Sequence, residues 1–410
     1  MENTALFIVP RGSDEWKGNE AGWITASGWA GAAGEIFGTS YVATTDGIFS
    51  PKESIEFPKG NKDATTSKKP KKIRKFIPEF LITAYKDFKL KNSKPRVWPV
   101  EENKFLKNKN VKFVWERHDL FPGPGHKIAE KLNVPFIISV EALAVWEAKK
   151  WGVKRPLWGN WLEKNIEAKS LENADLICCV SQEIKYKVIS MGINEDKVLV
   201  TPNRVDSLLF NPEVKNSRIS EKYNLKGKIV FGWTGSFRNF HGLDSVVKAF
   251  KLVKDKTPNA ILILVGDGQE FDKIKHLVTE LNLEENVIFV GRKKFVKVPD
   301  YVSNFDICLV SAKSAEGFHY SPLKLREYLA LGKAVIVPNA GDLSSNFGDG
   351  KDVLMYKPGE VNDLANKMLL LISNELLKQT LEHNALHWFH AEGSWVHELN
   401  RVCEILGIEK

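Results

Sequence analysis

The sequence predicts an α/β protein built from two doubly wound, Rossmann-like domains. Short continuous runs of valine, isoleucine and leucine alternate with amphipathic segments along the whole chain, as in AILILVG, VIFVG and LDSVVKAFKLVKD. Continuous apolar runs are typical of strands buried on both faces of a parallel sheet, and strand–helix repetition produces right-handed βαβ units. Because the chain has 410 residues, it is too long for one ordinary core, and two such domains are expected.

Nine apolar runs are predicted to be strands, and the helices are predicted between them. The first half has ALFIV (5–9), FVWE (113–116), FIISV (136–140) and LICCV (176–180). The second half has KIVFGW (228–233), AILILVG (260–266), VIFVG (287–291), ICLVS (307–311) and AVIVP (334–338). Helical periodicity is clearest in LDSVVKAFKLVKD and in SPLKLREYLALG.

The boundary between the halves is expected in TPNRVDSLLFNP (201–212), which has the composition of a loop. We therefore expect one domain over 1–205 and a second over 206–389. A further region, about 51–110, is rich in lysine, serine, threonine and proline and has few apolar runs, so it is interpreted as an insertion or mobile surface element.

Composition excludes several classes of protein. No apolar run is long enough to span a bilayer, and the N-terminal stretch lacks the pattern of a secretory signal, so a cytoplasmic protein is expected. Cys178, Cys179 and Cys308 lie in apolar runs and are expected to be structural, and no Cys or His pairs with metal-ligand spacing occur. The net charge of +8, much of it in residues 68–75 (KKPKKIRK), indicates an acidic partner: nucleic acid, anionic lipid or a phosphate-bearing substrate.

Loops that follow strands of the second half carry residue types that bind phosphate. After KIVFGW, Gly235 permits close approach of the backbone to a ligand, and Arg238 and His241 offer charge to a diphosphate. The alternative is an ordinary turn with an exposed arginine. In the next loops Gly266 belongs either to a ligand site or to a tight turn, and Arg292 either borders a nucleotide base or is simply solvated.

The segment SAKSAEGFHYSPLKLREYLALG (311–332) contains the most candidate residues. Pro322 is expected as the first residue of a helix, with Leu325, Leu329 and Ala330 on its buried face. Glu327 follows one turn into that helix. A carboxylate there is either a partner of the helix dipole or a ligand for two ribose hydroxyl groups, as in dinucleotide-binding folds.

The order of these segments resembles the retaining GT-B glycosyltransferases, glycosyltransferase family 4 (glycosyl transferases group 1) in particular. The resemblance covers most of the second half through WTGSF, HGLDSVVKAF, LVGDG, VIFVG, FDICLVS and SPLKLREYLALGKAVIVPNAG. The first half matches more loosely, through WERHDLF, IAEKLNVPFIISVEA and ENADLICCVSQ. The resemblance implies a GT-B fold, with two Rossmann-like doubly wound domains facing each other across a cleft. Residues 1–205 would be the acceptor side, completed by a helix at about 390–410, and 206–389 the donor-binding side.

The resemblance also implies roles for donor-site residues. Glu327 matches the second of two family glutamates, which holds the donor ribose, whereas the position of the first is occupied by His319, with Glu316 three residues upstream. Ser236 and His241 stand where the family has its phosphate-binding arginine and lysine, which leaves Arg238 as the candidate cation. In the S-P-L-K variant of the family motif, Lys324 assists the phosphates. The remaining donor-site candidates in that motif are Ser321 and Leu323.

In the first half, the resemblance places a histidine near the reaction centre, and His118 matches it after a predicted strand. The alternative for His118 is a surface imidazole in a loop. Glu141, which follows FIISV, is a second candidate. The loop from Gly12 to Gly22, which includes Gly18, resembles the one that lies over donor phosphates and acceptor.

These features predict transfer of a sugar from a nucleotide-sugar donor to an unidentified acceptor, with retention at the anomeric carbon. Arg238, Lys324 and helix N-termini would stabilise the departing diphosphate, so neither a cofactor nor a metal ion is expected. The alternatives are a nucleotide-sugar epimerase or another GT-B enzyme, and a nucleic-acid- or anionic-surface-binding protein that uses residues 68–75. Nucleic acid is not the expected partner. Apolar residues follow the basic run directly, which favours peripheral association with an anionic membrane.

Overall fold

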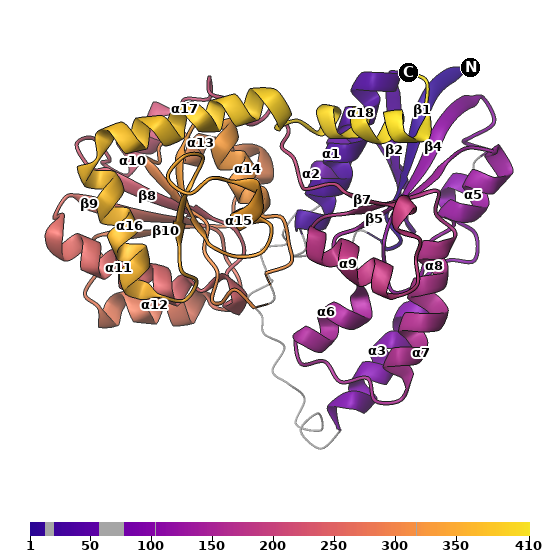
Figure 1. The fold of residues 1–410 in the computed structure, drawn as a ribbon, viewed down its shortest axis with the longest axis horizontal. Helices are drawn as coiled ribbons and strands as arrows, with labels where there is room; N and C mark the ends of the chain where they lie inside the picture. The colour runs from indigo at the N-terminus through magenta and orange to yellow at the C-terminus, as the bar shows by residue number, and fades with distance from the viewer. Residues whose placement is uncertain (13–19, 57–77, 103, 317) are drawn as a thin grey trace. The chain divides into compact units, whose positions relative to one another are not determined.

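The computed structural model describes residues 1–12, 20–56, 78–102, 104–316 and 318–410. The chain divides into two compact units (Figure 1). Unit 1 comprises Met1–Pro202 and Trp395–Lys410, and unit 2 comprises Asn203–Ser394. The boundaries expected at 205/206 and near 390 lie a few residues from these divisions.

Unit 1 is built on a sheet in the order β3-β2-β1-β4-β5-β6-β7, parallel except for the antiparallel edge strand β3. All four apolar runs predicted as strands in this half form strands. The strands β2, β3 and β7 were not predicted: β2 (TSYVA) is not continuously apolar, and β3 and β7 comprise only two and three residues. The strands are β1 (Glu2–Ile8), β2 (Thr39–Ala43), β3 (Ile48–Phe49), β4 (Lys109–Arg117), β5 (Phe136–Val140), β6 (Leu176–Cys179) and β7 (Val198–Val200).

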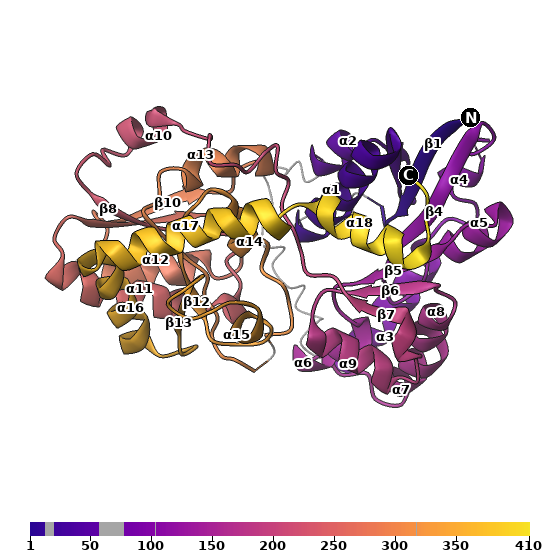
Figure 2. The ribbon, with the colours of Figure 1, turned by 45° about the horizontal axis from the view of Figure 1, so that its top comes forward.

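The helices of unit 1 include one from the far end of the sequence. Helix α18 (Trp395–Leu406) packs beside α1 (Glu20–Phe37), as Figure 2 shows. Trp29 of α1 lies with its ring centroid 4.9 Å from that of Trp395 and 4.5 Å from that of Trp115 on β4, so the three rings join both helices to the sheet. The other helices are α2 (Pro51–Glu56), α3 (Glu79–Ser93), α4 (Pro99–Glu102), α5 (Gly125–Leu132), α6 (Ala144–Lys150), α7 (Trp158–Leu162), a π-helical turn (Glu163–Glu167), α8 (Ala168–Glu172) and α9 (Gln182–Ser190).

The interpretation of region 51–110 as irregular was wrong for the residues that the structure describes. They form α2, α3 and α4 and the start of β4. On the side toward the protein, α3 buries Asp87 in an ion pair with Arg155 in place of part of a hydrophobic contact. The basic run 68–75 lies outside the described residues.

Unit 2 contains an all-parallel sheet in the order β10-β9-β8-β11-β12-β13. The five predicted strands of this half are present, and the short β13 is additional. The strands are β8 (Ile229–Thr234), β9 (Ala260–Val265), β10 (Val287–Gly291), β11 (Ile307–Leu309), β12 (Ala334–Pro338) and β13 (Leu354–Tyr356). Cys308 on β11, like Cys178 and Cys179 on β6, is buried, as expected for structural cysteines.

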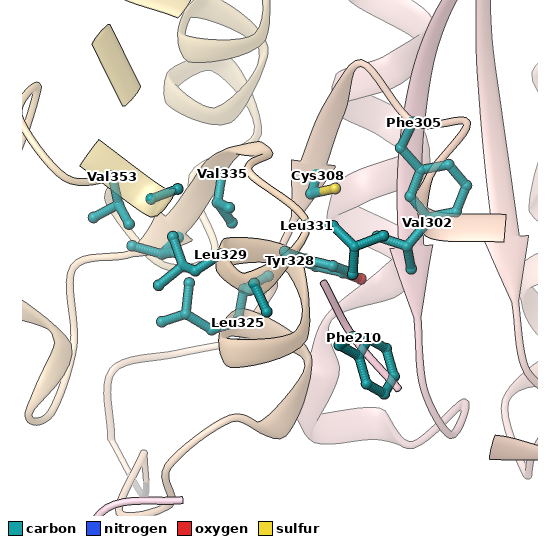
Figure 3. Close-up of a cluster of buried hydrophobic side chains, with 14 of the residues drawn as sticks. Phe210, Val302, Phe305, Cys308, Leu325, Tyr328, Leu329, Leu331, Val335 and Val353 are labelled. Carbon is teal, nitrogen blue, oxygen red and sulfur yellow. The ribbon is translucent and has the colours of Figure 1, made fainter. Parts of the chain in front are cut away.

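Helices cover both faces of the second sheet. Helix α14 is buried almost all round and packs through Leu325, Tyr328 and Leu329 into an apolar cluster that also contains Cys308 and Val335 (Figure 3). It begins at Leu323, so Pro322 precedes the helix rather than starting it. The helices are α10 (Ser217–Lys222), α11 (Leu243–Lys256), α12 (Phe271–Glu280), α13 (Val298–Val302), α14 (Leu323–Ala330), α15 (Leu343–Asn346), α16 (Val361–Ser373) and α17 (Glu375–Glu392).

Each sheet has one point where the strand order reverses direction, and this point defines a binding crevice at the carboxyl ends of the strands. In unit 2 it lies between β8 and β11, so the loops 235–242 and 310–322 flank it. In unit 1 it lies between β1 and β4, next to Arg11 and His118. No helix among the described residues is long and apolar enough to cross a membrane.

Candidate functional site

The switch point of unit 2 contains a buried lysine. Lys324, in the first turn of α14, lies with its Nζ 3.7 Å from the centroid of the Trp233 ring. A side chain at Gly235 would place a Cβ 2.8 Å from that Nζ, so glycine gives the ammonium group room to approach the loop after β8. Nζ is buried and has no hydrogen-bond partner within the described part of the chain. An ammonium group carries three donors, and leaving them unmade in a buried site is costly.

The same helix carries a buried carboxylate one turn further on. Burial raises the pKa of Glu327 to about 7, with the Lys324 charge acting in the opposite direction. Burial lowers the pKa of Lys324 to about 7, against the effect of the Glu327 charge. Both shifts have desolvation as their main cause, and each group would recover its ordinary charge state if a ligand of complementary polarity entered. Such strongly shifted groups at a switch point are typical of functional sites.

Two hydrogen bonds join the strand, loop and helix around this pair. Trp233 Nε1 donates to Ser311 Oγ at 2.9 Å, which connects the end of β8 to the loop after β11. The backbone N–H of Thr234 donates to the Tyr328 hydroxyl at 2.8 Å, which connects β8 to α14. None of these residues was among the predicted site residues, because each lies inside an apolar run and resembles ordinary core. One feature of the sequence could have indicated them: a buried tryptophan or tyrosine usually needs a hydrogen-bond partner, so Trp233 and Tyr328 mark places where polar groups meet in the core.

His241, predicted as a charge for the diphosphate, is buried against Trp233 with ring centroids 5.6 Å apart. Burial lowers the pKa of His241 well below its usual value, and the charges of Lys324 and Arg238 lower it further. The imidazole is therefore neutral near pH 7 and supplies a hydrogen bond rather than a positive charge. Arg238 differs, because its side chain is exposed at the edge of the same loop, as is that of Arg292 in the loop after β10.

The glycine of the loop after β9 has a packing role. Gly266 has φ +149°, and a Cβ there would lie 1.8 Å from the carbonyl oxygen of Gly235. The backbone N–H of Gly235 also donates to the Val265 carbonyl at 3.0 Å. The tight contact between the two loops thus accounts for the glycine, and through it Gly266 supports the backbone of Gly235.

In the loop before α14, the two candidates for the position of the first family glutamate differ in their exposure to solvent. His319 is buried, whereas Glu316 is exposed. Ser321 Oγ accepts a hydrogen bond from the backbone N–H of Asn203 at 3.2 Å, and its carbonyl accepts one from Asn203 Nδ2 at 2.7 Å. These bonds hold the start of α14 to the first residue of unit 2. Ser236 and Leu323 are both partly exposed beside this segment.

In unit 1, His118 follows β4 and is buried. Its Nε2 lies 3.0 Å from Glu167 Oε1, a fully buried carboxylate in the π-helical turn Glu163–Glu167. Glu167 also accepts hydrogen bonds from the backbone N–H groups of Ala144 at 2.7 Å and Val145 at 3.2 Å. A carboxylate accepts, so Nε2 of the histidine carries the proton, and Nδ1 is left as an acceptor. Nδ1 has no partner among the residues that are described.

Paired charged side chains also follow β1, β4 and β5 in unit 1. Asp119 pairs with Arg11 through Nε at 2.9 Å and Nη2 at 2.5 Å, and these contacts hold the pKa of Asp119 below its usual value despite burial. Glu141, after β5, accepts from Thr25 Oγ1 at 2.7 Å and from Arg117 Nε at 3.1 Å. The negative charge of Glu141 is therefore paired with the positive charge of Arg117. π-Helical turns such as the one that carries Glu167 occur frequently at functional sites.

The predicted loop from Gly12 to Gly22 is only partly as expected. Gly22 lies in the first turn of α1, which begins at Glu20, and its carbonyl accepts from Thr25 Oγ1 at 3.1 Å. Gly22 is therefore a helix residue rather than a loop residue. Gly18 lies outside the described residues.

Comparison with known proteins finds glycosyltransferases among the proteins similar to this chain. Residues 215–388 match the family model described as glycosyl transferases group 1. Two uncharacterized glycosyltransferases of Methanocaldococcus jannaschii are 23% and 29% identical to this chain, over 60% and 66% of its length. The aligned regions cover 62% and 68% of those two proteins.

Among solved structures, Anabaena HepE in complex with UDP-glucose is similar at a TM-score of 0.64 and 15% identity, covering 98% of this chain and 99% of that one. Together with the two parallel-sheet units, this similarity shows that the chain has the GT-B fold.

Proposed function

We propose that this chain, with its GT-B fold and its group 1 glycosyl transferase segment, transfers a sugar from a nucleoside-diphosphate sugar to an acceptor. The observation that carries the proposal is the buried, unpartnered Lys324 one helical turn from the buried Glu327, at the switch point of the unit 2 sheet. A diphosphate supplies the acceptor oxygens that Lys324 lacks, and ribose hydroxyl groups supply the donors that suit a carboxylate. A similar structure contains UDP-glucose, which supports this donor class.

In the proposed reaction the bond between the anomeric carbon and the diphosphate breaks, and an acceptor hydroxyl oxygen bonds to that carbon. The leaving diphosphate gains negative charge, which Lys324, the exposed Arg238 and the N-terminal amides of α14 would stabilise. We expect these groups to suffice without a metal ion. Retention at the anomeric carbon is the expectation from the resemblance to retaining enzymes, and NMR of the product's anomeric proton tests it.

Unit 1 would provide His118. Its Nδ1 is an acceptor without a partner in the described structure, so a hydroxyl group of the donor sugar or of the acceptor would satisfy it. Glu167 holds the opposite nitrogen and thereby selects the tautomer. The acceptor is unidentified. We infer from the basic sequence that it is presented at the cytoplasmic face of an anionic membrane, with the enzyme bound there peripherally.

A thermal-shift screen of the full chain against nucleoside diphosphates and nucleotide sugars tests the function. A ligand that binds only the folded chain stabilises it by about 2.7 kcal/mol at a hundred times its dissociation constant. We expect UDP or another nucleoside diphosphate to raise the melting temperature, and the matching nucleotide sugar to be consumed on addition of acceptor extracts. If no nucleotide stabilises the chain at millimolar concentration, the proposed function is wrong.

Replacing Glu327 by glutamine tests the ribose contact. Loss of charge-assisted hydrogen bonds costs about 1.5–3 kcal/mol, so UDP and uridine should bind roughly ten- to a hundredfold more weakly. Pyrophosphate, which has no ribose, should bind as well as before or better, because a negative charge has been removed beside Lys324. Titration calorimetry with UDP and ligand-observed NMR with the weaker ligands measure this. Equal weakening of pyrophosphate would mean that Glu327 shapes the helix instead.

Replacing Arg238 by alanine tests the exposed cation. Because its side chain is solvated, its interaction with a diphosphate should be of the size of an exposed ion pair, about 0.2–1 kcal/mol, or at most about fivefold in affinity. UDP affinity should fall by this factor and lose part of its dependence on salt, while uridine binding stays unchanged. Arg218→Ala, at an exposed position on α10, is the matched control. A parallel loss of uridine binding would show that Arg238 only supports the loop.

A further inference from the structure

Helix α3 of unit 1 turns its apolar face outward. Phe80, Leu81, Tyr85 and Phe88 are all exposed, with 67% of the surface of both Tyr85 and Phe88 accessible. At about 100° per residue, these four positions fall within roughly 140° of the helix circumference. They therefore form one apolar stripe, which the core of the protein does not use.

Two contacts of α3 with the rest of unit 1 explain why the stripe faces outward. Asp87 is buried and accepts hydrogen bonds from Arg155 Nε at 2.8 Å, Arg155 Nη2 at 2.9 Å and Trp158 Nε1 at 3.0 Å. Leu90 packs against an apolar cluster that includes Leu162. This bidentate ion pair and the leucine contact fix the rotation of the helix about its own axis.

A second exposed segment lies beside α3. Residues 151–161 comprise the connection between α6 and α7 and the start of α7, and they include the Arg155 and Trp158 that bind Asp87. Helices α3 and α7 lie side by side in both ribbon views (Figures 1 and 2). Trp151 and Trp161 are about half exposed, and Leu157 is 100% exposed. Leu157 has φ +70°, a conformation that costs free energy for a residue other than glycine and is found where surrounding structure imposes it. We call α3 and residues 151–161 together the α3 surface.

Lysine side chains border these apolar groups. Lys89 lies just outside the apolar stripe of α3, next to Tyr85, and Lys91 lies within it, between Phe80 and Phe88. Lys149 and Lys154 flank Trp151 in the sequence. All four are exposed, and none has an ion-pair partner among the described residues. The buried carboxylate of this region, Asp87, is already paired with Arg155. The α3 surface therefore combines exposed apolar side chains with exposed lysines.

We propose that the α3 surface docks onto an anionic lipid bilayer. Tryptophan and tyrosine combine an apolar ring with a polar group and suit the boundary between headgroups and acyl chains, where lysine side chains reach the lipid phosphates. A second copy of the chain fits less well, since a symmetric contact would bring lysines against lysines. The proposal rests on the exposed side chains of α3 and of residues 151–161, and it does not depend on the basic run 68–75. Lipid binding needs no turnover, so its failure would leave the proposed glycosyl transfer intact.

Co-sedimentation of the full chain with vesicles tests the proposal. We expect binding to vesicles of phosphatidylcholine with one-third phosphatidylglycerol, weaker binding in high salt, and little binding to pure phosphatidylcholine. The variant Lys89→Gln/Lys91→Gln/Lys154→Gln should bind roughly a hundredfold more weakly, at about fivefold for each lysine. The variant Tyr85→Ser/Phe88→Ser/Trp161→Ser should bind at least tenfold more weakly. The matched controls Lys248→Gln and Leu376→Ser, at exposed positions of unit 2, should bind like the unchanged chain.

Four results would overturn the proposal. The first is unchanged binding by both triple variants, and the second is equal binding of the chain to neutral vesicles. The third is loss of binding when the six cations of residues 68–75 alone are replaced by glutamine, while the α3 variants still bind. The fourth is a dimer in sedimentation velocity that the Tyr85/Phe88/Trp161 variant dissociates, which would make the α3 surface a contact between copies. Circular dichroism and thermal melting of each variant establish that it is folded.

Discussion

Lys324→Met is expected to reduce UDP and pyrophosphate binding by roughly ten- to a hundredfold, and turnover by more, while leaving uridine binding unchanged. The physical reason is that Nζ has no hydrogen-bond partner in the described part of the chain and lies over the Trp233 ring at 3.7 Å, so a diphosphate is the group that would satisfy it. Turnover should fall further because charge develops on the leaving group in the transition state. Calorimetric titration and steady-state kinetics measure the two effects, with Lys248→Met on α11 as the control at an exposed position.

Lys324→Met should also change the way in which the stability of the folded chain depends on pH. The pKa of Lys324 in the folded chain, about 7, lies below its ordinary value of 10.5. Between these values the unfolded chain binds a proton that the folded chain lacks, so this residue makes stability rise with pH from about 7 to about 10.5. Lys324→Met removes that rise, and below pH 7 it removes a charge that destabilises the fold. The variant should therefore melt at or above the temperature of the unchanged chain at pH 6, with the difference narrowing toward pH 10.

The affinity for UDP should depend on pH for the same reason. A bound diphosphate favours protonated Lys324, so binding takes up a proton above pH 7, and affinity should fall by up to about tenfold per pH unit. In Lys324→Met this dependence should be absent. A lower melting temperature at every pH, or a loss of uridine binding equal to that of pyrophosphate, would contradict the assignment of Lys324 to the diphosphate.

His118→Ala is expected to lower kcat by on the order of a hundredfold or more, with a much smaller change in UDP affinity. The hypothesis is that Nδ1 holds a hydroxyl group of the transferring sugar or of the acceptor, an interaction that the nucleotide does not share. Single-turnover kinetics and UDP titration separate the two quantities. Equal losses in kcat and in nucleotide affinity would make His118 a binding or structural residue.

Glu167→Gln distinguishes a positioned imidazole from one that is merely buried. The amide of glutamine either donates to or accepts from His118 Nε2, so the fixed tautomer is lost while the volume is kept. If Glu167 positions the ring, kcat should fall with little change in KM, and the 15N shifts of the two imidazole nitrogens should show a mixture of tautomers. If the pair is only structural, the melting temperature should fall while kcat of the folded fraction stays unchanged.

Much of the fold was predictable because parallel strands buried on both faces must be continuously apolar. All nine predicted runs form strands, from ALFIV in β1 to AVIVP in β12, and the two long amphipathic segments form α11 and α14. The missing strands are β2, β3, β7 and β13, which lie in shorter or more polar segments than the predicted apolar runs. The apolar residues of α3 face outward, which contradicts the usual assumption that an apolar face marks the core.

By itself, the sequence determined the order of strands and helices, the loops in which chemistry is expected, and the identities of Glu327, Lys324 and His118 as candidates. Those follow from local composition and from residue order, which the chain carries without folding. Only the tertiary structure decided which of them are desolvated and what lies against them. It placed Lys324 over Trp233 beside Gly235, made His241 neutral, separated buried His319 from exposed Glu316, and brought Glu167 to His118 from 49 residues away. Burial and long-range contacts set charge states and hydrogen-bond partners, and both depend on elements that are distant in the chain and adjacent only once the sheets have formed.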